Sequence, residues 1–217
     1  GDCILFRAAD DHLVPDAMFS AKEAFANQPD ATIAFGETIF FERDPCNGTK
    51  ETLALSSTTK FFPRNDLLQE WVPDFNLPSS ACFVRKSAVL SVGGFKDEAK
   101  WHSDWLCFTT IALRDGLTFI PQPITGFRLN PQSYGNSSLM KQGSQRPVLR
   151  YLVNEVMNYE DGLRELFFAS GAFAIFGDSI RSLLAEEKGS LPKGSEKLLP
   201  NEWERKCFSG KIHRHGI

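Results

Sequence analysis

The chain opens with GDCILFRAADD, residues 1–11, and this stretch sets the expected fold class. Residues 3–6 form an apolar run that predicts a short strand. Asp10 and Asp11 follow shortly after it. Because α/β sheets place ligands at the carboxyl ends of their strands, adjacent carboxylates here are candidates to hold a hard divalent cation. Acidic residues before a helix also serve as turn or capping residues, so both interpretations stay open.

Helix and strand patterns alternate after this point. Pro15 and Pro29 bound a helical pattern in which Met18, Ala21 and Phe25 share one face. The other predicted elements are a strand at 32–41, a pairing segment at 51–55 joined to it by turn residues 44–48, a helix at 64–71, a strand at 81–84, a helix at 86–89, a helix at 103–114, and a strand at 117–120 ended by Pro121 and Pro123. This alternation predicts an α/β core.

Three further segments carry residues suited to chemistry. Gly93 and Gly94 predict a loop with positive φ or a close backbone approach. Asp104 begins the helix at 103–114, which Ser103 can cap, and the helix N-terminus favours an ionised carboxylate. Asp104 is either a helix-stabilising acid or a general base. The side chains that could bind substrate near these positions are Trp101 and Trp105 by stacking and Arg128 as an anion clamp.

The order of these segments resembles that of the family 2 glycosyltransferases, over about residues 1–135. Residues 1–11 look like the family segment that binds the metal and the nucleotide diphosphate. Gly93-Gly94-Phe95 with Asp104 is similar to the family's "G-G-F…[E/S]-D" region, where the Asp is the catalytic base. Residues 127–130 with Ser133 look like its "Y-R-x-H-x-x-S" segment. The resemblance implies a GT-A-type mixed sheet, here its acceptor-side half, with an α-helical C-terminal extension.

The resemblance also implies a reaction. A sugar would pass from a nucleotide-sugar donor to the hydroxyl of a glycan or lipid-linked acceptor with inversion, in bacterial polysaccharide or glycan biosynthesis. Asp10 and Asp11 would hold Mg²⁺ or Mn²⁺ on the diphosphate, and Asp104 would be the base. Gly93 and Gly94 would bind substrate together with the side chains of Trp101, Trp105 and Arg128.

Departures from the family pattern support an alternative. Ala8, Ser103 and Asn130 stand where many members carry Asp, Glu and His, and the 217 residues hold no counterpart of the nucleotide-binding half that members carry ahead of this segment. A non-catalytic carbohydrate-binding or interaction module derived from a truncated glycosyltransferase is therefore the second hypothesis. Sequence upstream of Gly1 would discriminate between the two.

Composition narrows the class of protein. The 217 residues are 42% apolar and 24% charged with a formal net charge of −3, which excludes intrinsic disorder and argues against nucleic-acid binding. Five widely spaced cysteines favour a reduced, cytoplasmic compartment over a disulfide framework. A homo-oligomer stays open.

The carboxyl-terminal third differs from the rest of the chain in its composition and sequence pattern. Residues 136–187 predict a helical region after a polar loop at 132–146, with one helix through Leu149 and Val156 and a second from about 162 to 187. The apolar run 166–177 has 12 residues, too few for a bilayer span, and predicts a buried helix with an interfacial helix as the alternative. Residues 188–217 hold seven Lys or Arg against three Glu, so a weak peripheral contact with the inner face of the membrane competes with a solvated tail.

Overall fold

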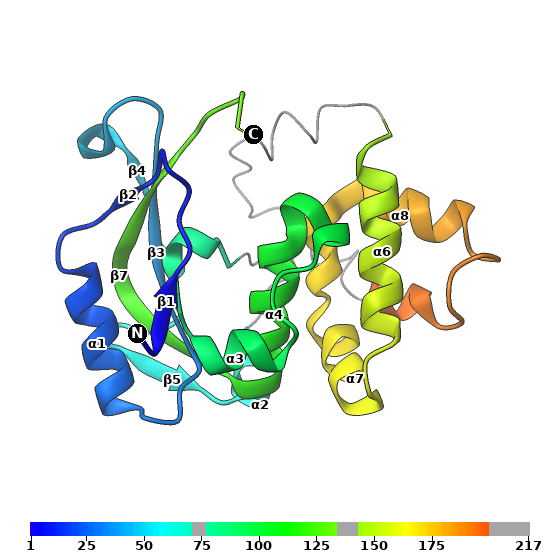
Figure 1. The fold of residues 1–217 in the computed structure, drawn as a ribbon, viewed down its shortest axis with the longest axis horizontal. Helices are drawn as coiled ribbons and strands as arrows, with labels where there is room; N and C mark the ends of the chain where they lie inside the picture. The colour runs from blue at the N-terminus through cyan, green and yellow to red at the C-terminus, as the bar shows by residue number, and fades with distance from the viewer. Residues whose placement is uncertain (71–76, 134–142, 200–217) are drawn as a thin grey trace.

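Residues 1–70, 77–133 and 143–199 are described in the computed structural model of the chain (Figure 1). Helices cover both faces of a mixed sheet: α1 (Ala17–Asn27) lies on one face, and α2 (Arg64–Glu70), α3 (Lys86–Ser91) and α4 (Ser103–Asp115) lie on the other. A further helical layer packs against α4 and consists of α6 (Gln145–Met157), α7 (Asp161–Ser170) and α8 (Gly177–Glu186). The α/β core with a helical C-terminal part is therefore confirmed.

The described sheet has seven strands. They are β1 (Cys3–Leu5), β2 (His12–Leu13), β3 (Ile33–Phe41), β4 (Thr49–Glu51), β5 (Lys60–Phe62), β6 (Cys82–Arg85) and β7 (Leu117–Arg128). The order is β1-β6-β3-β7-β2, with β4 on β3 and β5 on β7. Because β3 and β7 are parallel and β6 is antiparallel to both β1 and β3, strands β1, β3 and β7 run in one direction. The register places the end of β1 level with Ala34, near the start of β3, whereas Arg128 at the end of β7 lies beside Phe41 at the end of β3.

Most predicted elements form close to their predicted bounds. The turn at 44–48 contains a short 3₁₀ helix, η1 (Pro45–Asn47), but the strand that pairs with β3 is β4 rather than residues 51–55. The predicted apolar face of α1 is wrong at one position, since Met18 is 65% exposed and Ala17, Ala21, Ala24 and Phe25 are buried instead. The predicted helix end at Trp71 lies outside the described residues, as does most of the polar loop at 132–146.

Strand β7 corrects the prediction that two prolines end it. It continues through Pro121 and Pro123 to Arg128. Pairing with β3 shifts register on both sides of Glu37, and the ladder passes from Ile120 directly to Pro123. Proline has no amide hydrogen to donate, and a bulge is a place where no donor is required.

The predicted helix from 162 to 187 is also wrong as a single element. It breaks at Gly171 and Gly177, whose φ angles of 61° and 53° interrupt the helix, into α7, a 3₁₀ turn η4 (Ala172–Phe176) and α8. The apolar run 166–177 is only partly buried: Phe167 and Phe173 are fully inaccessible, whereas Ala169 is exposed and residues 174–177 are half-buried. Within the described residues no single helix is long and apolar enough to cross a membrane, whereas α7 together with Ala172–Glu186, bent by 55°, reaches the required length and composition.

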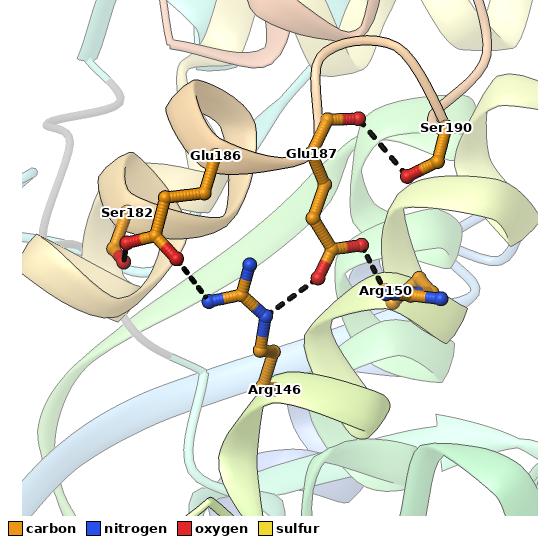
Figure 2. A network of polar contacts seen from close by, with 6 residues as sticks. All are labelled: Arg146, Arg150, Ser182, Glu186, Glu187 and Ser190. Carbon is orange, nitrogen blue, oxygen red and sulfur yellow. Dashed lines mark hydrogen bonds and ion pairs between the residues drawn. The ribbon is translucent and has the colours of Figure 1, made fainter.

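An ion-pair network fastens the outer helices to one another (Figure 2). Arg146 at the start of α6 lies 2.7 Å from Glu186 and 2.5 Å from Glu187 at the end of α8, and Arg150 also pairs with Glu187. Ser182 donates a hydrogen bond to Glu186. These contacts fix the beginning of α6, which matters for the candidate site described next.

Candidate functional site

Asp10 and Asp11 directly precede β2, which pairs antiparallel with β7, so they lie beside the carboxyl end of β7. The backbone amide of Arg128 donates a hydrogen bond of 3.1 Å to Asp11 Oδ1, and Asn130 Nδ2 donates one of 3.4 Å to Asp10 Oδ2. Asp11 is 7% exposed. The segments at 10–11 and 128–130, which are far apart in sequence, therefore meet as their order along the chain suggests.

Burial is the main influence on the charge of Asp11. It raises the pKa of this carboxyl, while the Arg128 amide, the neighbouring Ser80 hydroxyl and the Arg7 guanidinium lower it and the charge of Asp10 raises it. A desolvated carboxylate beside a second one attracts a cation. The described residues contain no cluster of three or more His, Cys, Asp or Glu side chains that could hold a metal ion alone. Two carboxylates nevertheless suit Mg²⁺, which takes one or two protein oxygens together with water and phosphate.

Arg128 contributes to this cluster through its backbone. Its side chain is exposed, and Nε donates a hydrogen bond of 3.2 Å to the carbonyl oxygen of Glu42. The guanidinium is thus held at the surface of the sheet, close to the carboxyl end of β3. Its role as an anion clamp stays a prediction.

The glycine loop has the predicted conformation. Gly93 and Gly94 have φ angles of 81° and 69°, in the region that favours glycine. The following Phe95 ring lies 4.6 Å from Phe6, just beyond β1, and 5.9 Å from Phe108 of α4. These ring contacts connect the loop to the residues that lead into Asp10 and Asp11.

Asp104 lies in the first turn of α4, next to a second short 3₁₀ segment, η2 (Ser79–Ala81). Its Oδ1 accepts a hydrogen bond of 2.8 Å from the Trp105 amide, and the Ser79 hydroxyl also bonds to the carboxyl. Burial outweighs these bonds and raises the pKa of Asp104, contrary to the expectation that the helix terminus favours its ionised form. The predicted Ser103 cap is also wrong, because its hydroxyl accepts a hydrogen bond from the Lys96 amide instead.

The two tryptophans have different environments. Trp105 is 5% exposed and packs edge-on against Phe173 and Phe176, with centroid distances of 5.4 and 4.7 Å. This core packing accounts for its position without a ligand. Trp101 is half-buried, and its indole Nε1 donates a hydrogen bond of 3.1 Å to Gln145 Oε1. Their role in substrate binding stays a prediction.

Ser79 and Ser80 are site residues that sequence reasoning missed. The hydroxyls of these two consecutive residues of η2 lower the pKa of Asp11 (Ser80) and of Asp104 (Ser79), although the buried Ser80 Oγ has no hydrogen bond of good geometry within the described structure. Two serines before a strand have no distinctive sequence pattern, and only the folded structure, in which η2 directly precedes β6, shows where they lie.

Comparison with known proteins identifies the fold. No protein-family model matches the chain, and neither does the sequence of any curated protein. Solved structures do match: S. aureus TarS residues 1–349 with UDP-GlcNAc (TM-score 0.62, 10% identity, 92% of this chain and 60% of that one), the same fragment with UDP (0.54, 11%, 91% and 52%) and S. aureus TarS itself (0.59, 13%, 92% and 36%). The chain has a glycosyltransferase-like fold. It spans about half of the TarS fragment bound to UDP.

Proposed function

We propose that the chain is the acceptor-side part of a metal-assisted, inverting glycosyltransferase that uses a nucleotide-sugar donor. The observation that carries the proposal is that the consecutive serines Ser79 and Ser80 of η2 influence Asp104 and Asp11, and that Asp10 adjoins Asp11, in a glycosyltransferase-like fold. The TarS structures with UDP and UDP-GlcNAc support a uridine diphosphate sugar as the first donor to test.

The roles of the residues follow from their chemistry. Asp10 and Asp11 would hold Mg²⁺ or Mn²⁺, which neutralises the charge that develops on the leaving diphosphate. Asp104 would accept the proton of the acceptor hydroxyl as that oxygen attacks the anomeric carbon from the face opposite the diphosphate. A raised pKa suits this task, because a base is most effective when its pKa approaches the working pH.

The base is tested in the full-length protein with the Asp104→Asn variant. Loss of a general base lowers kcat by about 10²–10⁴-fold. Asp97→Asn, an exposed acid on the preceding segment, is the matched control and should keep full activity. Full transfer by Asp104→Asn would remove Asp104 from the mechanism.

The metal site is tested by calorimetry. Binding of UDP with Mn²⁺ should lose its heat in Asp10→Ala and in Asp11→Ala but not in the Asp97→Asn control. Unchanged heats would overturn the assignment of these two carboxylates. Binding of a glycan by a full-length protein that transfers no sugar from any nucleotide donor would favour the carbohydrate-binding module instead.

A further inference from the structure

The segment before Asp104 contains a strained residue. A 3₁₀ segment, η3 (Asp97–His102), leads directly into α4, and within it Lys100 has φ 50° and ψ −124°. A residue other than glycine in this region costs about 1–3 kcal/mol and persists only where its surroundings hold it in place. The approach to Asp104 therefore depends on contacts from elsewhere in the fold.

Gln145, the first residue of α6, supplies contacts on one side. Its Oε1 accepts the hydrogen bond from Trp101, and its amide nitrogen and oxygen lie 3.0 and 3.2 Å from His102 Nε2. Burial lowers the pKa of His102 to about 4, so the imidazole is neutral near pH 7 and can exchange a single hydrogen bond with an amide. One amide group thus fixes two consecutive residues of the strained segment.

Phe176, the last residue of η4, contacts both flanks of Asp104. Its ring centroid lies 4.8 Å from that of His102 and 4.7 Å from that of Trp105, edge-on in each case. His102 precedes Asp104 by two residues and Trp105 follows it. The backbone amide of Trp105 also donates the hydrogen bond to the Asp104 carboxylate. The packing of the Trp105 ring therefore influences the orientation of this hydrogen bond.

We infer that Gln145 and Phe176, both from the C-terminal helical region, are positioning residues for the Asp104 carboxylate. The inference rests on the proposed role of Asp104 as the base. It makes the helical layer part of the site, because that layer holds the turn that presents the base as well as covering the core of α4. Neither side chain touches the reacting atoms, so both act through Trp101, His102 and Trp105.

Two variants remove these contacts, and two controls match them. Gln145→Met keeps the side-chain length but loses both hydrogen bonds, and Phe176→Ala removes the shared ring. Phe168→Ala is the control for Phe176, because Phe168 is a buried aromatic of α7 packed under Lys197, with no described ring contact to His102 or Trp105. Phe176→Leu should restore most of what Phe176→Ala loses.

The readout that does not depend on activity is the titration of Asp104. Carbon-13 NMR of the aspartate carboxyls in the 217-residue chain should show the pKa of Asp104 falling toward 3.8 in both variants, because loosening the turn hydrates the carboxylate whose burial raises its pKa. Among the described residues, the other titratable groups that interact with the charge of Asp104 are the Cys82 and Cys107 thiols. Burial raises their pKa values, that of Cys107 to about 12, so both stay protonated throughout the titration.

The kinetic readout uses the full-length protein. Misplacing a base by about 1 Å lowers kcat by as much as about 10²-fold, so kcat should fall toward that limit while KM for the donor changes less than about twofold. The ascending limb of the pH profile should move to lower pH in Gln145→Met and Phe176→Ala and stay in place in Phe168→Ala.

The outcomes separate the two proposals. An unchanged pKa of Asp104 in both variants, or an equal change in Phe168→Ala, overturns the positioning role. A lowered pKa together with full transferase activity of Asp104→Asn supports positioning and overturns the role of Asp104 as base.

Discussion

His102 lies in the described structure between the Gln145 amide and the Phe176 ring, and burial lowers its pKa from 6.5 to about 4. In the unfolded chain this imidazole takes up a proton near pH 6.5, whereas in the folded chain it does so only near pH 4. Between these values the unfolded state binds more protons, so acidification favours unfolding. The stabilising contribution of neutral His102 is complete above pH 6.5, decreases as the pH falls from 6.5 toward 4, and is fully lost below the folded pKa.

The size of the effect follows from the two pKa values. Each pKa unit corresponds to about 1.4 kcal/mol, so full protonation of His102 costs the fold about 3 kcal/mol, of which about 2 kcal/mol is already lost between pH 7 and pH 5. The buried carboxyls of Asp11 and Asp104 act in the opposite direction, because their raised pKa values favour the folded state as the pH falls.

The assay compares the unmodified chain with His102→Gln, which cannot take up the proton. Urea unfolding of both proteins at several pH values between 7 and 5 gives the free energy of unfolding, and the carboxyl contributions cancel in the difference. The difference between the two proteins should shift by about 2 kcal/mol over this range, with the variant losing less stability. Parallel pH profiles would refute the reasoning, and so would an NMR titration of His102 near 6.5.

Other substitutions test the packing and the backbone. Phe173→Ala removes a fully buried ring beside Trp105 and should lower the free energy of unfolding by about 3–5 kcal/mol in urea titrations; a loss below about 1 kcal/mol would contradict the described packing. Gly116→Ala places a Cβ 2.5 Å from the Phe62 carbonyl oxygen at φ 90° and should lower the free energy of unfolding by about 1–3 kcal/mol, whereas an unchanged melting temperature would contradict this strain. Glu187→Gln weakens the network of Figure 2 and should lower the melting temperature more at low than at high salt; a salt-independent loss would exclude an electrostatic cause.

The sequence predicted those parts of the fold that depend on local patterns. Apolar strands, the helix through Trp105 and the positive φ of the glycine loop follow from neighbours in the chain, and the structure confirms them. Strand β7 differs because a proline ends a strand only where a ladder bond is needed there, and the bulge that removes this need lies opposite Glu37 on another strand. Gly171 and Gly177 break a helix that a continuous apolar run predicts to be unbroken.

For the candidate site, too, contacts that depend on partners distant in sequence could not be predicted. Asp11 and Arg128 meet because Asp11 directly precedes β2, a two-residue strand that the sequence analysis did not predict and that pairs with β7. Ser79, Ser80 and Gln145 could not be predicted, because a serine pair or a glutamine at a helix start is common and gains meaning only from a partner distant in sequence.

The contact between residue 128 and Asp11 is made by an amide hydrogen that every residue except proline possesses. The backbone of β7 therefore orients the Asp11 carboxylate, whatever the side chain at position 128. Saturation mutagenesis at this position would separate two functions within a single residue. The eighteen substitutions that keep a backbone N–H would report on the loss of the guanidinium, and the further effect of proline beyond theirs would report on the Asp11 carboxylate.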